Sequence, residues 1–375
     1  MMELGMINPK FTMAALSAMM LMGGPSVYAA DLGGNCCADL EERVAELEAT
    51  TARKGNRKQT LTVYGQVHAG MFFHNIEGAD RAKMSVIDGA QSQSRIGFKG
   101  SAKINEDVSA GFVLEIGVGG FEEGTGASTN TLAKRLAYVH ITSKKLGSVS
   151  LGTQSTATDG LAEIDLSQSA LASLPLSLAP ADSALIGISV SPFDGSRANA
   201  IKYTSPLVGG FSLQAAWVSE DAFDVALRYA GEFGGIRVAA GAGYREDGGP
   251  LGFFPDTKTI LGSASVMHVK TGVFLSGSYA KQDLNGIGDL QAYAVRGGIE
   301  YKASSLGKTT IFAEWGSLDL PTGIDGTPTV MGAGIVQGID AAAMDIYGSW
   351  KQYDDKDIVG LGTQNVFMVG ARIKF

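Results

Sequence analysis

The sequence is poor in proline, charge and cysteine, and each shortage removes a class of protein. Proline accounts for 10 of 375 residues, whereas glycine accounts for 51, about twice its usual share. High glycine without high proline excludes a collagen-like or proline-rich disordered chain. Charged residues make up only 18 %, the net charge is −8, and there is no basic block. We therefore expect no nucleic-acid partner.

Long apolar runs are also missing. Beyond the amino-terminal region, no stretch approaches the ~18 consecutive apolar residues that a membrane-spanning helix needs, and the mean hydropathy is only slightly positive. This excludes a helical membrane protein. A β-barrel remains compatible with the composition, because only alternate residues of its strands face lipid.

Residues that would form a catalytic or metal site are scattered. The four histidines show no nucleophile or metal-ligand spacing; they are His68, His74, His140 and His268. The glycine-rich run at 241–249 does not follow a strand and open a helix, as a phosphate-binding loop would. We expect no enzyme activity, no metal and no cofactor.

The amino terminus reads as an export signal followed by a short periplasmic segment. Lys10 precedes an apolar core, and Val27-Tyr28-Ala29 offers small residues for cleavage, so we expect a signal peptide at 1–29; a short buried helix is the alternative. The only cysteines, Cys36 and Cys37, are adjacent. Neighbours in sequence rarely pair with each other, so a disulfide framework is excluded, although pairing between subunits is not.

The rest of this segment, 30–58, carries an apolar repeat. Leu40, Val44 and Leu47 continue a 3- and 4-residue spacing from Cys37, which predicts the seam of a short coiled coil. So short a helix is marginal alone and requires chains that are already gathered. An amphipathic helix on a barrel rim is the alternative.

Residues 59–375 repeat one pattern, in which apolar and small or polar residues alternate over about ten positions. In 210–218, Phe211, Leu213 and Trp217 share a face opposite Ser212 and Gln214. Other polar faces carry full charges, and apolar faces often end in Tyr or Trp, as expected for a wet lumen and a lipid-facing wall. We predict an all-β, antiparallel transmembrane barrel of about sixteen strands.

One segment, 156–196, breaks this alternation. It contains no Lys, Arg or His, and a long irregular loop of this kind is generally functional or disordered. We predict that it folds into the bore as a constriction loop. Its acidic residues are Asp159, Glu163, Asp165, Asp182 and Asp194.

Several stretches resemble the Gram-negative general diffusion porins in their trimeric, sixteen-strand form. They include LTVYGQV at 61–67, SRIGFKG at 94–100, KRLAYVHI at 134–141, GSVSLGTQ at 147–154 and the terminal NVFMVGARIKF. Residues 30–58 resemble the start of alphaproteobacterial porins. The resemblance covers nearly the whole mature chain.

The resemblance implies a homotrimer in which the third loop narrows each barrel opposite a ladder of basic wall residues. Arg95 and Arg135 match that ladder, and Lys202 is a weaker candidate. Alternation places Leu136 and Tyr138 on the face opposite Arg135. The wall is less basic than in many relatives, since Gln66, Thr153 and Thr204 occupy places that are often basic.

These observations predict an outer-membrane porin for passive diffusion of ions and small hydrophilic solutes, in contact with outer-membrane lipid and lipopolysaccharide. Five loop acids against about three wall bases favour mild cation preference. A substrate-selective porin is one alternative. A structural barrel tethered to peptidoglycan is another, because cleavage after Ala29 would leave Ala30 at the mature terminus, as in some alphaproteobacterial barrels that are attached there.

Overall fold

The computed structural model describes residues 59–76, 83–89, 92–118, 132–172, 193–219, 222–247, 257–286, 288–321, 327–354 and 363–375. They form seventeen strand segments and two short 3-10 helices, η1 (Ser169–Leu171) and η3 (Asp340–Ala342). The strands are β1 (Gln59–Ile76), β2 (Lys83–Asp88), β3 (Arg95–Lys103), β4 (Val108–Val118), β5 (Leu132–Ser143), β6 (Gly147–Ser155), β7 (Arg197–Thr204), β8 (Phe211–Val218), β9 (Phe223–Phe233), β10 (Ile236–Asp247), β11 (Thr257–His268), β12 (Val273–Leu284), β13 (Gly288–Ser304), β14 (Gly307–Asp319), β15 (Thr329–Ile339), β16 (Met344–Asp354) and β17 (Gln364–Lys374).

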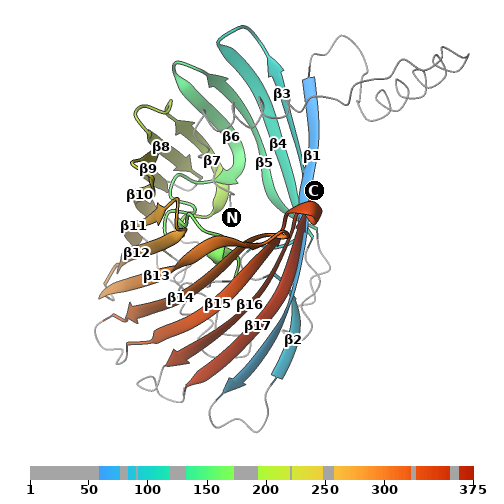
Figure 1. Ribbon diagram of the computed structural model, residues 1–375. Coiled ribbons are helices and arrows are strands. Elements are labelled where there is room, and N and C mark those ends of the chain that lie inside the picture. The colour runs from blue at the N-terminus through green and yellow to red at the C-terminus, as the bar shows by residue number, and fades with distance from the viewer. Residues whose placement is uncertain are drawn as a thin grey trace, which may run out of the picture.

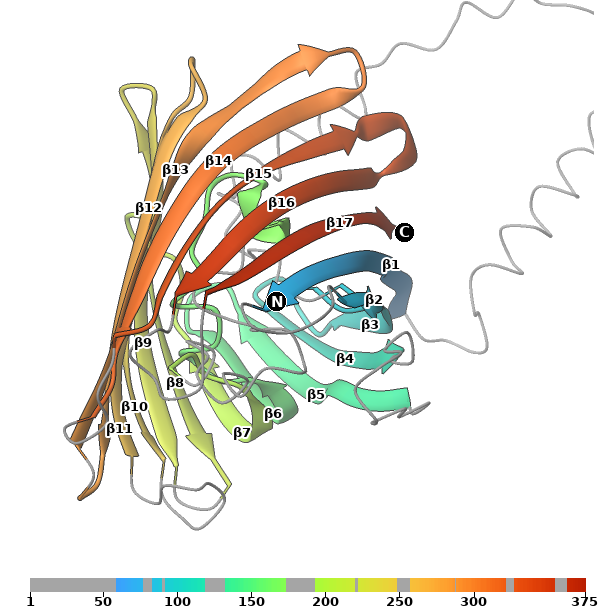
Figure 2. The ribbon, with the colours of Figure 1, turned by 90° about the horizontal axis from the view of Figure 1, so that it is seen from below.

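The strands close into one antiparallel barrel, in which blue β1 lies beside red β17 (Figures 1 and 2). The closing pair runs from Gln66↔Lys374 to Ile76↔Gln364. β2 and β3 pair with different parts of the same edge of β1. The seventeen segments therefore fill sixteen positions around the barrel, which confirms the predicted strand number.

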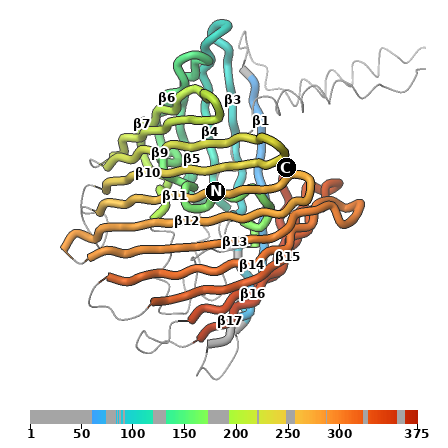
Figure 3. The backbone as a smooth tube through the Cα atoms, turned by 60° about the vertical axis from the view of Figure 1, so that its left-hand side comes forward, coloured from blue at the N-terminus to red at the C-terminus, as the bar shows by residue number. Residues whose placement is uncertain are grey.

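Apolar side chains cover the outer wall, whose strands β7 to β17 run side by side in Figure 3. On β8, Phe211, Leu213 and Trp217 are 48 %, 50 % and 61 % exposed, whereas Ser212 between them is buried against the inside. Exposed apolar groups at alternate positions are unfavourable in water and suit a lipid-facing wall. Among the described residues, no helix is both long and apolar enough to cross a membrane.

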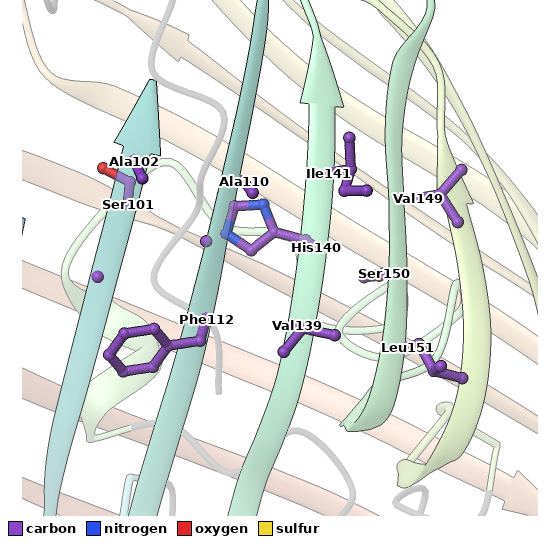
Figure 4. Close-up of a pocket in the computed structure, with 12 residues that line it drawn as sticks. Ser101, Ala102, Ala110, Phe112, Val139, His140, Ile141, Val149, Ser150 and Leu151 are labelled. Atoms are coloured by element: carbon purple, nitrogen blue, oxygen red, sulfur yellow. The ribbon is translucent and has the colours of Figure 1, made fainter. Parts of the chain in front are cut away.

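A hollow of ≈ 500 Å³ indents this outer wall over β3 to β6 (Figure 4). Val139, Ile141 and Val149 line it, and each is more than half exposed. Gly100 of β3 lines its other side and has no side chain to fill the space. The hollow therefore belongs to the apolar exterior and not to the bore.

The predicted signal peptide, cysteine pair and coiled coil fall in residues 1–58, outside the described residues. The same holds for Ala30, for the seam of Leu40, Val44 and Leu47, and for Asp182 of the loop. These parts of the sequence analysis stay predictions.

Candidate functional site: a constricted bore

The segment after β6 leaves the wall and lies inside the ring of strands (green in Figure 2). Its base is closed by Thr156 N donating to Ser196 O at 3.0 Å. The buried Asp224 carboxylate of β9 accepts hydrogen bonds from Ala157 N at 3.0 Å and from Thr158 N and Oγ1 at 2.8 and 2.7 Å. The loop is thus fixed to the inner wall from its first residues, as the sequence predicts.

Further along, the loop packs on β10 and β11. Ile164 N donates to Ser263 Oγ at 3.1 Å. The Leu161 side chain is fully buried over two glycines of β10: a Cβ atom on Gly241 or Gly243 would lie 2.4 or 2.6 Å from a Leu161 methyl. Any side chain at either glycine would collide with the loop, so the missing Cβ atoms make the seat for this apolar contact.

Asp165 does not present its charge to the bore. Its side chain is 2 % exposed and lies 3.0 Å from Arg296 NH1 on β13. Arg296 also pairs with Glu314 of β14, which pairs with Lys351 of β16 at 2.7 Å. The expectation that Asp165 acts as a bore-lining acid therefore gives way to a buried charge chain that joins loop and wall.

The other loop acids that the structure describes lie together near the base of the loop. Asp194 accepts hydrogen bonds from Gly160 N at 2.9 Å and Ala162 N at 3.1 Å. Burial, aided by the charges of Glu163 and Asp159, raises the pKa of the Asp194 carboxyl to about 8, although the two backbone donors oppose the rise. Burial likewise raises the pKa of Glu163. Asp159, Glu163 and Asp194 therefore form one electrostatically coupled group.

We expect the channel to become more cation-preferring as pH rises through about 8. A carboxyl whose pKa is raised from 3.8 holds its proton in the folded loop at pH values where the unfolded chain has lost it, so loop stability falls as pH rises from about 4 to about 8. Over the upper part of this window the bore gains negative charge. Reversal potentials measured at about pH 6 and pH 9 should show the increase, and Asp194→Asn should reduce it. A pH-independent ratio in the unaltered channel would contradict the assignment.

Two of the predicted wall bases, Arg95 and Arg135, lie on the wall formed by β3 to β5. Arg135 Nε donates to Glu115 Oε1 at 2.8 Å, and Arg95 Nε lies 3.9 Å from Glu115 Oε2. Arg197 at the start of β7 interacts electrostatically with both Arg135 and the loop residue Asp159. In a sixteen-position ring, this wall lies across from the β9 to β13 wall on which the loop rests.

A β-bulge in β5 places Leu136 and Tyr138 on the other face of the strand from the one predicted. The register of β4 with β5 shifts between Glu115 and Ile116, so that Glu115 stands opposite Leu136 while its carboxylate binds Arg135. Tyr138 stands opposite Val113, two residues before Glu115. Leu136 and Tyr138 therefore share the inner side with Arg135, and simple alternation was wrong there because the bulge adds one residue to β5.

Lys202 and several residues that the sequence analysis missed serve the loop. Lys202 Nζ donates to Ser155 O at 2.6 Å, at the point where the loop leaves the wall. Arg228 donates to Ala157 O and Asp159 O, and Arg245 NH1 donates to Asp194 O. The only sequence signal for Arg228 and Arg245 is their position on the polar face of a strand. Many other charged residues share that position, so the signal does not distinguish these two.

A closed barrel with an apolar exterior and a charged bore narrowed by an inserted loop defines a membrane channel. Consistent with this, the family model of the Gram-negative porins matches residues 15–372, and the chain belongs to that family. It is therefore a multi-pass β-barrel of the outer membrane that forms a channel for passive diffusion. Porins as a family are channels and not enzymes. No curated protein matches the sequence.

Solved structures share the fold at low sequence identity. The anion-selective porin from Comamonas acidovorans matches with a TM-score of 0.59 at 17 % identity, over 85 % of this chain and 100 % of that one. OmpF from Salmonella typhi, in complex with daunomycin, gives 0.60 at 16 %, over 86 % and 99 %. The trimer form of OmpT from Vibrio cholerae gives 0.59 at 15 %, over 84 % and 99 %.

Proposed function

We propose that the described part of loop 156–196 forms the constriction of a general diffusion channel with mild cation preference. The observation that carries this proposal is the separation of charge across the bore. Asp159 and Glu163 lie on the loop, which rests on β9 to β13, whereas Arg95 and Arg135 lie on the facing wall. Glu115 offsets part of the charge of Arg95 and Arg135, whereas Arg228 and Arg245 lie on the side of the loop and bind its backbone.

Such an arrangement acts on solutes through a field directed across the narrowest point. Polar solutes can align with that field, whereas apolar solutes lose hydration without compensation. Ion choice follows the charges that line the constriction. Single-channel recording of the purified, unboiled protein in a planar bilayer tests the proposal. Large steps with weak ion preference are expected, and very small currents would favour the substrate-selective alternative.

Neutralising the two loop acids should lower the cation preference. Asp159→Asn and Glu163→Gln each remove one negative charge from the bore, and a charge about 6 Å from a passing ion in water changes its population roughly threefold. Reversal potentials across a salt gradient measure the change, which for Glu163 should be larger above its raised pKa. Asp107→Asn at an exposed turn is the matched control. An equal shift of the reversal potential in that control would contradict the placement of Asp159 and Glu163 at the constriction.

We further propose that three copies assemble. Trimers are known for the neighbour from Vibrio cholerae, and the hollow over β3 to β6 offers a concave apolar surface to a second copy. Current steps that close in thirds would support the trimer. A single closing step would contradict it and leave the hollow to lipid.

A further inference from the structure

The strand that pairs with one edge of β1 is interrupted near the middle of β1, where β2 ends and β3 has not yet begun. Asp88, the last residue of β2, pairs with Ala69, and Arg95, the first residue of β3, pairs with Gln66. Six residues, 89–94, therefore stand against only two residues of β1. A regular ladder pairs residues one to one, so this stretch is four residues longer than the wall requires.

The described part of this stretch turns inward. Gln66 and His68 belong to the inner face of β1, since Val67 between them is 54 % exposed on the outside. Gln66 Nε2 donates to Ser92 O at 2.7 Å and to Gln93 O at 2.9 Å. His68 Nδ1 lies 2.8 Å from Ser92 O. We call Gly89 together with 92–94 the shelf; residues 90 and 91 lie outside the described residues.

Hydrogen bonds hold the shelf firmly. The Asp88 carboxylate accepts hydrogen bonds from Ser94 N at 2.8 Å and Ser94 Oγ at 2.7 Å. His68 Nε2 lies 2.8 Å from the Tyr347 hydroxyl of β16. A Cβ atom on Gly89 would lie 1.7 Å from His68 Nδ1, so only glycine fits there. Buried polar groups that are all paired fix a single arrangement.

The shelf also meets the basic wall. Arg95 NH2 donates to Ser92 Oγ at 3.3 Å, and Arg135 NH1 donates to Gln93 Oε1 at 3.4 Å. Gln93 itself is exposed, although the neighbouring Ser92 and Ser94 are only 2 % and 3 % exposed. The shelf thus helps to orient both arginines and leaves one amide side chain uncovered on the inner side of the barrel.

We propose that the shelf is a second constriction element and that Gln93 is a selectivity-determining residue. The inference rests on the proposed function and adds to it. The described part of loop 156–196 narrows the bore from the β9 to β13 wall, while the shelf narrows it from β1. A passing solute then meets acids on one side and, on the other, arginines beside a neutral amide that offers a donor and an acceptor.

A charge introduced at position 93 provides the first test. Gln93→Glu adds a carboxylate beside Arg135. One charge about 6 Å from an ion in water raises the population of a cation roughly threefold and lowers that of an anion by the same factor, so the cation/anion permeability ratio should rise roughly ninefold. Thr62→Glu is the matched control, since Thr62 lies on the same inner face of β1 but away from the shelf. A shift at Gln93 no larger than at Thr62 would overturn the proposal.

A second measurement tests whether reagents in the bore reach position 93. It introduces the charge only after the protein has folded. Gln93→Cys, treated in the bilayer with a cationic or an anionic methanethiosulfonate, should lose conductance with both reagents and shift the reversal potential in opposite directions. The unaltered protein is the background, because it carries Cys36 and Cys37. Large steps that neither reagent changes would refute the shelf as a constriction and leave the diffusion channel intact. Absent steps in the unaltered protein would instead refute the channel proposal.

Discussion

Arg296→Met should destabilise the folded barrel and release the middle of the constriction loop. The arginine joins Asp165 of the loop to Glu314 of β14, and all three side chains are at most 8 % exposed. With Lys351, the chain has two charges of each sign and is neutral. Removing one partner from a buried ion pair typically costs about 3–5 kcal/mol, because the remaining charge stays buried without compensation.

The loss can be measured as a lower temperature at which the unboiled protein leaves its folded band on a gel. Arg237→Met is the matched control, because Arg237 pairs with Glu232 at 3.1 Å on the surface, with both side chains about one-third exposed. Such an exposed pair contributes about 0–1 kcal/mol. Arg296→Met combined with Asp165→Asn should recover part of the stability. Equal losses for the two arginine variants would contradict a buried charge chain.

Asp224→Ala should detach the first turn of the loop while the barrel stays folded. The carboxylate is 1 % exposed, and its removal leaves two buried backbone N–H groups, of Ala157 and Thr158, without an acceptor. Each unsatisfied donor costs about 1–3 kcal/mol. Because the loop stays attached through Ser263 and Asp165, we expect noisier and larger single-channel currents and not a lost channel.

Two further variants make this result specific. Asp224→Asn keeps one carbonyl oxygen and should give an intermediate effect. Asp107→Ala, at an exposed turn 3.6 Å from Lys145, removes a carboxylate without touching the loop and should leave the current noise unchanged. Steady wild-type currents from Asp224→Ala would show that the loop does not depend on this anchor.

The strands could be predicted because lipid and water impose opposite demands on alternate residues. Tyr293, Val295 and Tyr301 are exposed on the outside of β13, whereas Arg296 and Glu300 are buried on the inside, as alternation indicates. The existence of the loop was also visible, since 156–196 lacks this alternation. Alternation and its absence are both local features of the sequence. The first is repeated in many strands and the second extends over about forty residues, so both can be recognised without the structure.

The partners within the bore could not be predicted in the same way. Asp224 binds a loop residue 66 positions away, and Arg296 binds one 131 positions away, and no local pattern encodes such pairings. Asp159 and Asp165 are chemically alike, yet one is partly exposed and the other is buried against the wall. The bulge at Arg135 inserts one residue into β5, and the interruption at 89–94 adds four residues beside β1. The alternation of apolar and polar residues does not show where such insertions occur.

The pairing of β1 with β17 has a consequence for how the chain reaches its fold. Almost every other strand contact joins neighbours in sequence, but this seam brings Gly70 onto Gly370. Barrel closure requires strand number, tilt and stagger to agree around the whole ring, so a register slip in any hairpin accumulates at the seam and prevents closure there. The final strand, β17, can therefore pair with β1 only when the registers of all earlier strands are correct. Until then, β1 and β17 each keep an unpaired edge.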